Sequence, residues 1–373
     1  MVTIKEVKTK KEIKEFITFP LNLYKDNPYF VPPLYMDEKK LFKKDNPYKD
    51  SCEAVYFNAY RDGKIVGRIS GIIQRDANKK NNEKRARFTR FDSIDDQEVS
   101  NALFSAVEKW AISKGMDTVC GPLGFSDLER EGLLIEGFDQ LSTFEEQYNY
   151  DYYQKLIENF GYEKEVDWTE HKINVPDNDD GSLEKLSEYV LKRYNLHMGE
   201  AKNINEFIDK YVEGFFDIID SSYDKLYGTV PFTDAMKKEL ISSFRLIVSV
   251  KHVAVVLNED EKIVCFGLCF PSIGKAVQKS GGRLTPLTLI KLLKTIKKPE
   301  ILDLGLIGVD PAYLNTGINA VMAAGLMRML KENNFTHAET NLNLENNHSI
   351  QNMWKRFKET QHKRRRAFVK KLV

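Results

Sequence analysis

The sequence predicts an α/β (α+β) fold with a mixed sheet that is built twice in tandem. Each half of the chain shows the same order of elements: a β-hairpin, a strand, a helix, a strand, a second helix and a last strand. A helix between two strands is typical of a crossover over a parallel pair, and a hairpin adds antiparallel strands, so we expect a mixed sheet. The length of 373 residues also favours two domains, because it exceeds one ordinary core.

The N-terminal half begins its repeat with a hairpin. The turn Arg61-Asp62-Gly63 separates expected strands at 55–60 and 64–73. A strand at 87–91, a helix at 99–114, a strand at 118–120, a helix at 152–160 and a last strand at 166–175 are expected to follow. The first of these helices is predicted by apolar residues at helical spacing before Gly115, namely Val99, Leu103, Ala106, Val107 and Trp110.

The C-terminal half repeats this order. A hairpin at 253–270 precedes a strand at 301–309, a helix at 316–333, a strand at 336–343, a helix at 350–357 and a strand at 364–372. Helical spacing is again visible, in Ile318, Val321, Met322, Gly325, Met329 and Leu330. Two more helices, at 183–194 and 204–226, are expected to open this half. The polar, turn-rich run at 176–182 predicts the join, so we expect an N-terminal lobe at 1–176 and a C-terminal lobe at 177–373.

The composition excludes several classes of protein. Hydrophobic residues make up 42% of the chain and charged residues 30%, which is typical of a soluble globular protein. The net charge of +1 gives no overall field that would attract nucleic acid. No signal peptide or membrane span is expected, because no apolar run is long enough. Four cysteines fit a cytoplasmic protein, and Cys265 and Cys269 are expected to be buried thiols, so no metal is predicted.

Three stretches carry a resemblance to a known family. They are Phe30-Val31-Pro32-Pro33-Leu34 with Asn46-Pro47-Tyr48, then Gly121-Pro122-Leu123-Gly124-Phe125-Ser126 with the segment 132–153, and finally the segment 307–319. Together with the order of elements, they resemble a bacterial family of tandem proteins of the GNAT acyltransferase superfamily. The resemblance spans nearly the whole chain and implies two GNAT-like acyl-CoA N-acyltransferase lobes in tandem.

The resemblance implies that acetyl-CoA or another acyl-CoA binds where a strand turns into a helix. The first N–H groups of a helix lack partners and attract an anion such as a pyrophosphate, and a glycine allows its close approach. The family's loop pattern falls on residues 314–319, where glycine is retained but the first and last positions have become Leu314 and Asn319. The implied cofactor-binding residues are Val309, Gly317, Ile318 and Asn319.

A simpler interpretation of this loop is that Gly317 only eases a tight turn, with Asn315 or Thr316 as the N-cap of the helix. The corresponding turn of the N-terminal lobe, residues 91–98, has no glycine and carries four carboxylates. Carboxylates at a helix N-terminus satisfy the dipole themselves and repel a pyrophosphate. We therefore expect a degenerate cofactor loop in the N-terminal lobe and a partly retained one in the C-terminal lobe.

Candidate catalytic residues lie on the strand expected at 336–343. The resemblance implies a base beside the thioester, and Glu339 is predicted for that role, with Asn341 as a positioning residue on the same face. His337 shares this face. The tyrosine that serves as acid in the family is replaced by Trp354, and an indole cannot protonate a thiolate. The alternative is an exposed or interlobe strand.

Two insertions are expected beside the repeated elements. The segment 123–147 is acidic and would suit a cationic acceptor, or it packs as a structural loop. The segment 274–299 has no acidic residue, and Thr285 and Pro286 predict the start of a basic amphipathic helix with Leu289, Leu292, Leu293 and Ile296 on one side. Such a helix suits a membrane surface, an acidic partner or the phosphates of CoA. The usual arrangement, a helix packed on its lobe with solvated lysines, is the one we expect.

The function predicted from these features is acyl transfer from an acyl-CoA to the amino group of a small-molecule acceptor, with the cofactor in the C-terminal lobe. One alternative is a ligand-binding or scaffold protein without catalysis on the same fold. Another is an aminoacyl-tRNA-dependent transferase of the tandem GNAT type, which lacks the CoA loop. We expect a monomer or a small oligomer such as a homodimer.

Overall fold

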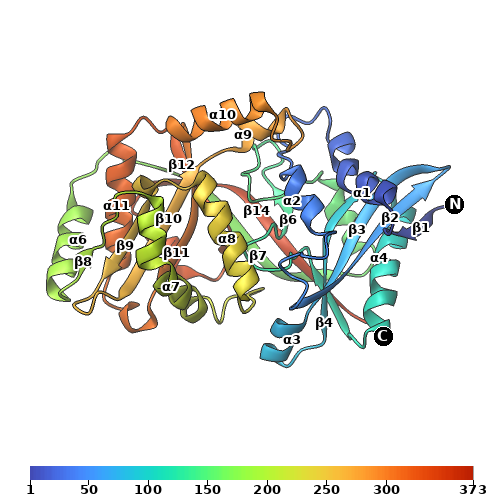
Figure 1. Cartoon of the computed structure of the whole chain (residues 1–373), viewed down its shortest axis with the longest axis horizontal. Coiled ribbons are helices and arrows are strands. Elements are labelled where there is room, and N and C mark those ends of the chain that lie inside the picture. Colours follow the sequence, from blue (N-terminus) through green and yellow to red (C-terminus); the bar gives the residue numbers. More distant parts are fainter. Residues whose placement is uncertain (373) are drawn as a thin grey trace. The chain divides into compact units, whose positions relative to one another are not determined.

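The computed structural model describes residues 1–372, and its internal contacts divide the chain into two compact units (Figure 1). Unit 1 contains Met1–Thr169, Ile273–Leu292 and the chain from His362 onward, and unit 2 contains Glu170–Ser272 and Leu293–Gln361. Each unit therefore includes residues from both halves of the sequence. The division at residues 176 and 177 that the linker composition favours stays a prediction.

Unit 1 is built on a mixed sheet. Its strands β1 (Thr3–Glu6), β2 (Cys52–Arg61), β3 (Lys64–Gln74) and β4 (Arg85–Ser93) pair antiparallel in this order. Strand β5 (Thr118–Gly121) then pairs parallel with β4. The final residues of β14 (Lys358–Lys371) run antiparallel to β5, with Phe368 opposite Gly121, and β6 (Leu133–Glu136) also pairs with β14. The end of the chain therefore completes the sheet of unit 1.

Helices cover the sheet of unit 1. Helix α4 (Gln97–Ser113) packs its apolar stripe on β2 to β5, and this core contains Phe88, Leu103 and Phe104. Helix α1 (Lys10–Leu23) lies against β2 and β3 and begins with a capping box between Thr9 and Glu12. The remaining helices of this half are α2 (Tyr35–Lys40), α3 (Arg75–Asn81) and α5 (Tyr152–Glu158). From the C-terminal half, unit 1 also takes α9 (Gly274–Gln278).

Unit 2 has a second mixed sheet. Its strands β8 (His197–Met198), β9 (Val253–Leu257), β10 (Ile263–Pro271) and β11 (Ile301–Val309) pair antiparallel in this order. Strand β12 (His337–Thr340) is parallel to β11 and is flanked on its other side by residues 172–173 of β7 (Glu163–Asn174). Strand β12 is thus an interior strand. A two-residue strand β13 (Asn343–Leu344) follows it in sequence.

Two groups of helices cover the two faces of this sheet. Helices α6 (Ser182–Arg193), α11 (Asn319–Glu332) and α12 (His348–Trp354) share one set of apolar clusters with the sheet. On the other face lie α7 (Ile204–Ser222) and α8 (Asp234–Ile247), packed on β9 and β10 through Phe215, Phe244 and Phe266. Two short 3₁₀ turns, Val250–His252 and Pro311–Tyr313, connect elements of this unit.

Strand β11 determines which side chains reach the face of α7. Opposite Leu268 and Cys269, its register skips one residue, Gly305, which is a β-bulge. Before the bulge Leu302 packs with the cluster of α11, and after it Leu306 and Gly308 lie toward α7 and α8. Strand β4 of unit 1 carries a corresponding irregularity, where Arg90 has a φ of 50°.

The mixed α/β fold that the sequence predicts is confirmed, and three local expectations are corrected. Helix α11 starts at Asn319 rather than at 316, because a 3₁₀ turn and the left-handed Gly317, at φ 83°, precede it. Thr316 is not its N-cap, since the Thr316 hydroxyl donates to the carbonyl of Tyr313. The strand expected at 336–343 is interrupted after Thr340. The sequence pattern did not predict helices α1, α2, α3, α8 and α9.

A matched pair of glycine substitutions tests the packing of β11 in unit 2. A Cβ atom at Gly308 would stand 2.4 Å from Phe266 Cε1 and 2.7 Å from Ile218 Cγ2, whereas one at Gly325 on α11 meets nothing within 4 Å. We expect Gly308→Ala to lower the free energy of unfolding by about 1–3 kcal/mol because of overpacking. Gly325→Ala should instead be neutral or stabilise by up to about 1 kcal/mol. Urea unfolding followed by circular dichroism measures both, and equal midpoints would contradict the described packing.

Candidate active site in unit 2

The N-terminus of α11 is the first component of the candidate site. Among residues 1–372, none accepts a hydrogen bond from the backbone N–H groups of Gly317, Ile318 or Asn319. The position before the helix is Ile318, whose side chain cannot cap it. Three donors without an acceptor therefore lie at the positive end of a 14-residue helix, the end that favours an anion.

The turn is open to solvent at Gly317 and partly at Asn319. Val309 and Ile318 are buried in one apolar cluster of unit 2, and Ile318 is fully buried, backbone included. Gly317 adopts the left-handed region at φ 83°, and a Cβ there would meet only Val190, at 3.5 Å. The amide of Asn319 donates to Ser349 Oγ at 3.3 Å, which draws this side chain toward the start of α12. The four predicted cofactor residues thus form one continuous strand–turn–helix.

An opening between β11 and β12 is the second component. The two strands pair from Ile301 opposite His337 to Leu304 opposite Thr340, and the Asn341 N–H still donates to the Leu304 carbonyl at 3.2 Å. Strand β11 continues for five more residues to Val309, beyond the last residue of β12. In this extension the carbonyl of Ile307 accepts a hydrogen bond of 2.9 Å from the hydroxyl of Tyr223, just after α7.

Buried carboxylates at this opening form the third component. Glu339 is 8% exposed and Asp303 is 4% exposed, and the two are register partners on β12 and β11. His337 Nε2 lies 3.0 Å from Glu339 Oε1, close enough for a hydrogen bond or an ion pair. Because Glu339 is buried, the polar face of β12 is not a solvent-exposed face. Burial and the nearby Asp303 carboxylate also raise the pKa of Cys269 to about 12, which keeps this thiol protonated.

Asn341 and Asn343 have different roles in this structure. Asn341 follows the point where the strands part, and its backbone carbonyl accepts a hydrogen bond of 2.6 Å from the Asn343 amide. Asn343 Oδ1 in turn accepts from the indole N–H of the buried Trp354, also at 2.6 Å. Trp354 therefore anchors α12 to the chain after β12. Asn341 Oδ1 and Nδ2 have no partner within the described part of the chain.

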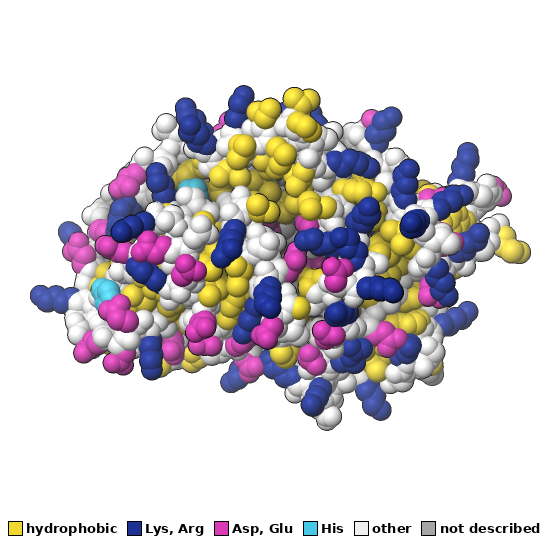
Figure 2. Space-filling view, in the orientation of Figure 1, with side chains coloured by type: hydrophobic (Ala, Val, Ile, Leu, Met, Phe, Trp, Pro, Cys, Tyr) yellow, Lys and Arg dark blue, Asp and Glu magenta, His cyan; other side chains and the backbone are white. Residues whose placement is uncertain are grey.

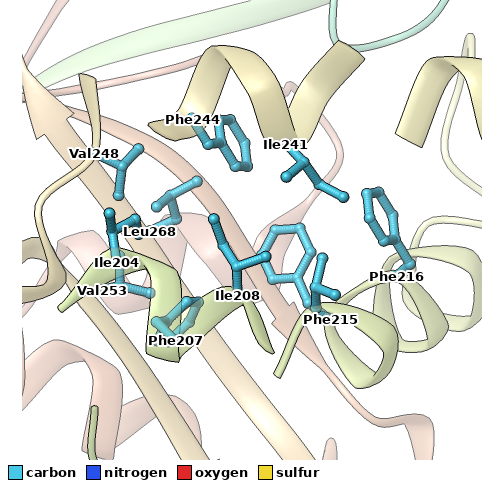
Figure 3. A pocket seen from close by; sticks show the side chains of 11 residues that line it. Ile204, Phe207, Ile208, Phe215, Phe216, Ile241, Phe244, Val248, Val253 and Leu268 are labelled. Atoms are coloured by element: carbon cyan, nitrogen blue, oxygen red, sulfur yellow. The ribbon is translucent and has the colours of Figure 1, made fainter. Parts of the chain in front are cut away.

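A pocket with an entirely apolar lining lies between α7, α8 and the sheet (Figure 3). Its cavity volume is about 30 Å³, and the figure rises to about 430 Å³ only when the open space around its mouth is included. Figure 3 shows the side chains of Ile208 and Phe215 from α7 pointing toward Ile241 and Phe244 from α8. Leu268 of β10 forms part of the floor of the pocket. Its register partner Leu306 lies in the part of β11 that continues beyond the end of β12. A hydrocarbon chain is the kind of ligand that such a lining accepts.

The corresponding places in unit 1 are filled by the protein's own side chains. Asp96 caps α4 by accepting from the Val99 N–H at 3.1 Å, and it pairs with Arg61 at 2.7 Å. Beyond the pairing of β4 with β5, the carbonyl and N–H of Ser93 are bound by the hydroxyls of Tyr152 and Tyr153. These tyrosines thus have structural partners in unit 1.

A buried ionic network follows the bulge of β4. Arg68 pairs with Asp92 at 2.8 Å, and Arg90 pairs with Glu38 at 3.1 Å. Tyr24 donates to Asp92 at 2.9 Å. Apart from the half-buried Arg90, these groups are buried, and their charges are mutually compensated, so this end of unit 1 is a packed polar core.

The acidic insertion of unit 1 packs into its own unit. Arg130 donates to the backbone carbonyls of Val31 and Phe144, and Glu129 accepts from the Phe125 N–H. Glu131 is 6% exposed, and its Oε2 atom has no hydrogen-bond partner among residues 1–372. Burial, with the carboxylates of Asp127 and Glu146 nearby, holds the pKa of Glu131 well above its usual range. The structure thus favours the interpretation of this segment as a structural loop.

The basic insertion departs from the expected packing. Thr285 caps α10 (Pro286–Lys297) as predicted, since its hydroxyl accepts from the Thr288 N–H at 3.2 Å. Leu289 and Leu293, however, are exposed, while Thr288 is buried. Leu292 and Ile296 are half-buried, so the predicted packing is wrong for Leu289 and Leu293 but not for these two residues.

Sequence reasoning missed Asp303, Tyr223 and the apolar pocket. Asp303 is a lone acid in the otherwise apolar strand ILDLGLIGV, and this pattern could have drawn attention to it. Tyr223 gave no comparable signal, because it lies 84 positions before its partner Ile307. The pocket depends on α8, which the pattern did not predict.

None of the helices within residues 1–372 is both long and apolar enough to cross a bilayer. In the same range, no group of three or more histidine, cysteine, aspartate or glutamate side chains is arranged to hold a metal ion.

Comparison with known proteins places this geometry in context. No protein-family profile matches the chain. The chain is 28% identical to protein YghO of Escherichia coli (strain K12) over 372 residues, which covers 97% of this chain and 94% of that protein. It is 29% identical to the bacterial ceramide synthase of Caulobacter vibrioides over 297 residues, covering 78% and 75% of the two chains.

Solved structures identify the fold. A tandem GNAT protein from the clavulanic acid biosynthesis pathway matches with a TM-score of 0.59 at 10% identity, covering 100% of this chain and 98% of that chain. A probable N-acyltransferase from Enterococcus faecalis V583 matches with a TM-score of 0.53 at 10% identity, covering 100% and 73%. The chain therefore has the tandem fold of the GCN5-related N-acetyltransferases, as the sequence resemblance predicted.

The buried Glu131 leads to a prediction on pH dependence. Its raised pKa means that the folded chain keeps the proton to a higher pH than the unfolded chain does. Stability is therefore lost as the pH rises above the unfolded pKa of about 4.3. Glu131→Gln keeps a neutral group, so we expect it to be more stable than the parent at pH 8, by on the order of 1 kcal/mol, and nearly equal at pH 4.

Thermal unfolding between pH 4 and pH 8 measures this difference. Asp139→Asn, at an exposed acid of the same insertion, is the matched control and should change little at any of these pH values. A Glu131→Gln variant less stable than the parent at pH 8 would show that the carboxylate is ionised and partnered.

Proposed function

We propose that unit 2 is an acyl-CoA-dependent N-acyltransferase that transfers a long-chain acyl group to the amine of a small-molecule acceptor. The observation that carries this proposal is the parting of β11 from β12 directly before the uncapped N-terminus of α11. One arrangement thus offers a strand edge without a neighbouring strand, where only the Ile307 carbonyl is bound by the Tyr223 hydroxyl, and backbone N–H groups without an acceptor for an anion.

The proposed position of acyl-CoA follows from this chemistry. Its pyrophosphate would bind the N–H groups of Gly317, Ile318 and Asn319, where the helix dipole favours negative charge. The amide-containing arm would run along β11 beyond Leu304, as an added strand binds a sheet edge. Val309, at the junction of strand and turn, would contribute its backbone. This direction leads the thioester toward the bulge at Gly305.

The proposed base is Glu339, beside the place where the strands part. Acyl transfer forms a C–N bond and breaks the C–S bond, so the amine must lose a proton and the leaving thiolate must gain one. Glu339 is buried and accompanied by His337 at 3.0 Å, an arrangement that can relay a proton. Asn341 would position the substrate with its side-chain amide. The Tyr223 hydroxyl on the Ile307 carbonyl is the proposed acid.

The apolar pocket supports a substrate with a hydrocarbon chain. Its lining from α7, α8, β9 and β10 has no polar group that could orient a small polar acyl group or acceptor. The relative from Caulobacter vibrioides is named a ceramide synthase, and a ceramide is the N-acyl product of a long-chain amine. We propose the same class of reaction here: amide formation between a long-chain acyl group and a long-chain amine, with one of the two chains in this pocket.

A glycine substitution tests the cofactor site. We expect Gly317→Asp to weaken acyl-CoA binding at least tenfold, because a carboxylate would repel the pyrophosphate at the helix N-terminus. The matched control is Gly181→Asp, which also lies at φ above 70°, before α6 in the same unit, with nothing within 4 Å of its Cβ position. Calorimetric titration with CoA, acetyl-CoA and palmitoyl-CoA should show the tightest binding for the long chain. Equal loss in both variants, or in neither, would refute the site.

A second substitution tests the catalytic assignment. We expect Glu339→Gln to lower kcat by about 10²–10⁴-fold while the Kd for acyl-CoA stays unchanged, because the amide cannot accept the proton. Single-turnover formation of the amide from palmitoyl-CoA and sphinganine is the measurement. Glu332→Gln, at an exposed glutamate that ends α11, serves as the control. Full activity of Glu339→Gln together with inactivity of Asp303→Asn would assign the base to Asp303 instead.

A further inference from the structure

Helix α10 has its polarity reversed relative to a packed surface helix. Several of its apolar side chains face solvent, with Leu287 72% and Leu293 67% exposed, while Thr288 is buried and Leu292 and Ile296 are half-buried. Leu289 and Ile290 are also exposed, and Leu289 and Leu293 lie one turn apart. Four large apolar side chains on a 12-residue helix exceed the scattered single exposures that need no explanation.

Positive charge accompanies this apolar face. From Gly274 to Pro299 the chain has seven basic residues and no acidic one: Lys275, Lys279, Arg283, Lys291, Lys294, Lys297 and Lys298. Figure 2 shows apolar side chains gathered over α10, at the top of the view, with lysine and arginine side chains beside them. The net charge of the whole chain is only +1, so this concentration is local.

The start of α10 is held firmly by unit 1. The Gly282 carbonyl accepts from the Tyr35 N–H at 3.0 Å, and the Arg283 guanidinium stacks over the Tyr35 ring at 4.5 Å. The Gln278 amide donates to the carbonyls of Pro28 and Phe30. These contacts fix the segment before the helix, so the exposed leucines belong to an anchored element and not to a frayed end.

We propose that α10 binds the surface of an anionic lipid bilayer, with Leu287, Leu289, Ile290 and Leu293 in the interface and its lysines on the lipid phosphates. Exposed apolar side chains with cationic side chains among them suit a helix that lies in the plane of a membrane interface. Twelve residues span only about 18 Å, so the helix rests on the bilayer and does not cross it. An acidic protein surface would match the lysines but would leave the exposed leucines without apolar partners.

The lysines of α10 favour an anionic bilayer over a second copy of the chain as the partner of its exposed side. A second copy would bring the lysines of its own α10 against those of the first, and like charges at close range oppose such pairing. Anionic lipid headgroups remove this repulsion, and each lysine near such a surface strengthens binding by roughly fivefold. The membrane is therefore the partner that satisfies both the apolar and the charged side chains.

This inference rests on α10 alone and is independent of the proposed acyl transfer. If both hold, membrane contact would place the protein where long-chain amines and their acylated products reside. The two proposals fail separately, because vesicle binding needs no acyl-CoA and acyl-CoA binding needs no vesicle.

Sedimentation of the full-length protein with sucrose-loaded vesicles tests the proposal. Vesicles of phosphatidylcholine with 30% phosphatidylglycerol are compared with pure phosphatidylcholine at 150 mM salt. We expect binding to the anionic vesicles, at least tenfold weakened by Leu289→Gln with Leu293→Gln, and weakened about 30-fold by Lys291→Gln with Lys294→Gln. The controls are Ile112→Gln, at an exposed apolar residue of α4, and Lys43→Gln with Lys44→Gln.

The outcomes of this experiment either support or overturn membrane binding by α10. Binding that the α10 variants lose and the controls keep supports the proposal, provided that circular dichroism shows all variants folded. Absence of binding by the parent chain overturns it, and so does binding that the α10 variants retain. A parent chain that is dimeric by light scattering and becomes monomeric in Leu289→Gln with Leu293→Gln would also overturn it, because a second copy would then cover the face.

Discussion

The short parallel pairing of β11 with β12 is the constraint on which the candidate site depends. Only the residues from Ile301 to Leu304 pair with β12, and the bulge at Gly305 follows at once. The bulge turns Leu306 and Gly308 toward α7 while Val309 stays with the cluster of α11. Strand β11 therefore leads from a buried carboxylate pair, past an apolar pocket, to the turn at Gly317, and each part of the site takes its position from this strand.

The two units differ in whether the N-terminus of the helix after the central strand is capped by a side chain. In unit 1 the helix after the central strand has its own cap in Asp96, and tyrosines occupy the free backbone groups of Ser93. In unit 2 the equivalent helix starts without a side-chain cap, and Gly317 supplies the left-handed turn. An uncapped helix forgoes about 1 kcal/mol of stability. That the chain caps one of these helices and leaves the other uncapped is the physical basis for the proposal that the chemistry takes place in unit 2.

Sequence patterns predicted the elements better than the contacts between them. Strand β11 was expected at its observed bounds, because an apolar run ending before Asp310-Pro311 leaves little choice. Patterns could not show that Glu339 is buried, since this depends on β7 pairing at Lys172, which is distant in sequence. The start of α11 was placed too early because helical spacing does not reveal the preceding 3₁₀ turn. Leu293 is exposed although the helical spacing of apolar residues in α10 predicts that it is buried.

Backbone donors without an acceptor and apolar side chains without a packing partner indicate where a ligand can bind. In this chain the ligands that such groups suit are chemically related. The open N–H groups of α11 suit a phosphate, the pocket around Phe215 suits a hydrocarbon chain, and the leucines of α10 suit an apolar phase. A small polar acyl group and a small polar acceptor would use the first of these and leave the other two idle. A long-chain substrate drawn from a membrane uses all three, which is why the lipid interpretation explains more of the molecule than a generic acetyltransferase does.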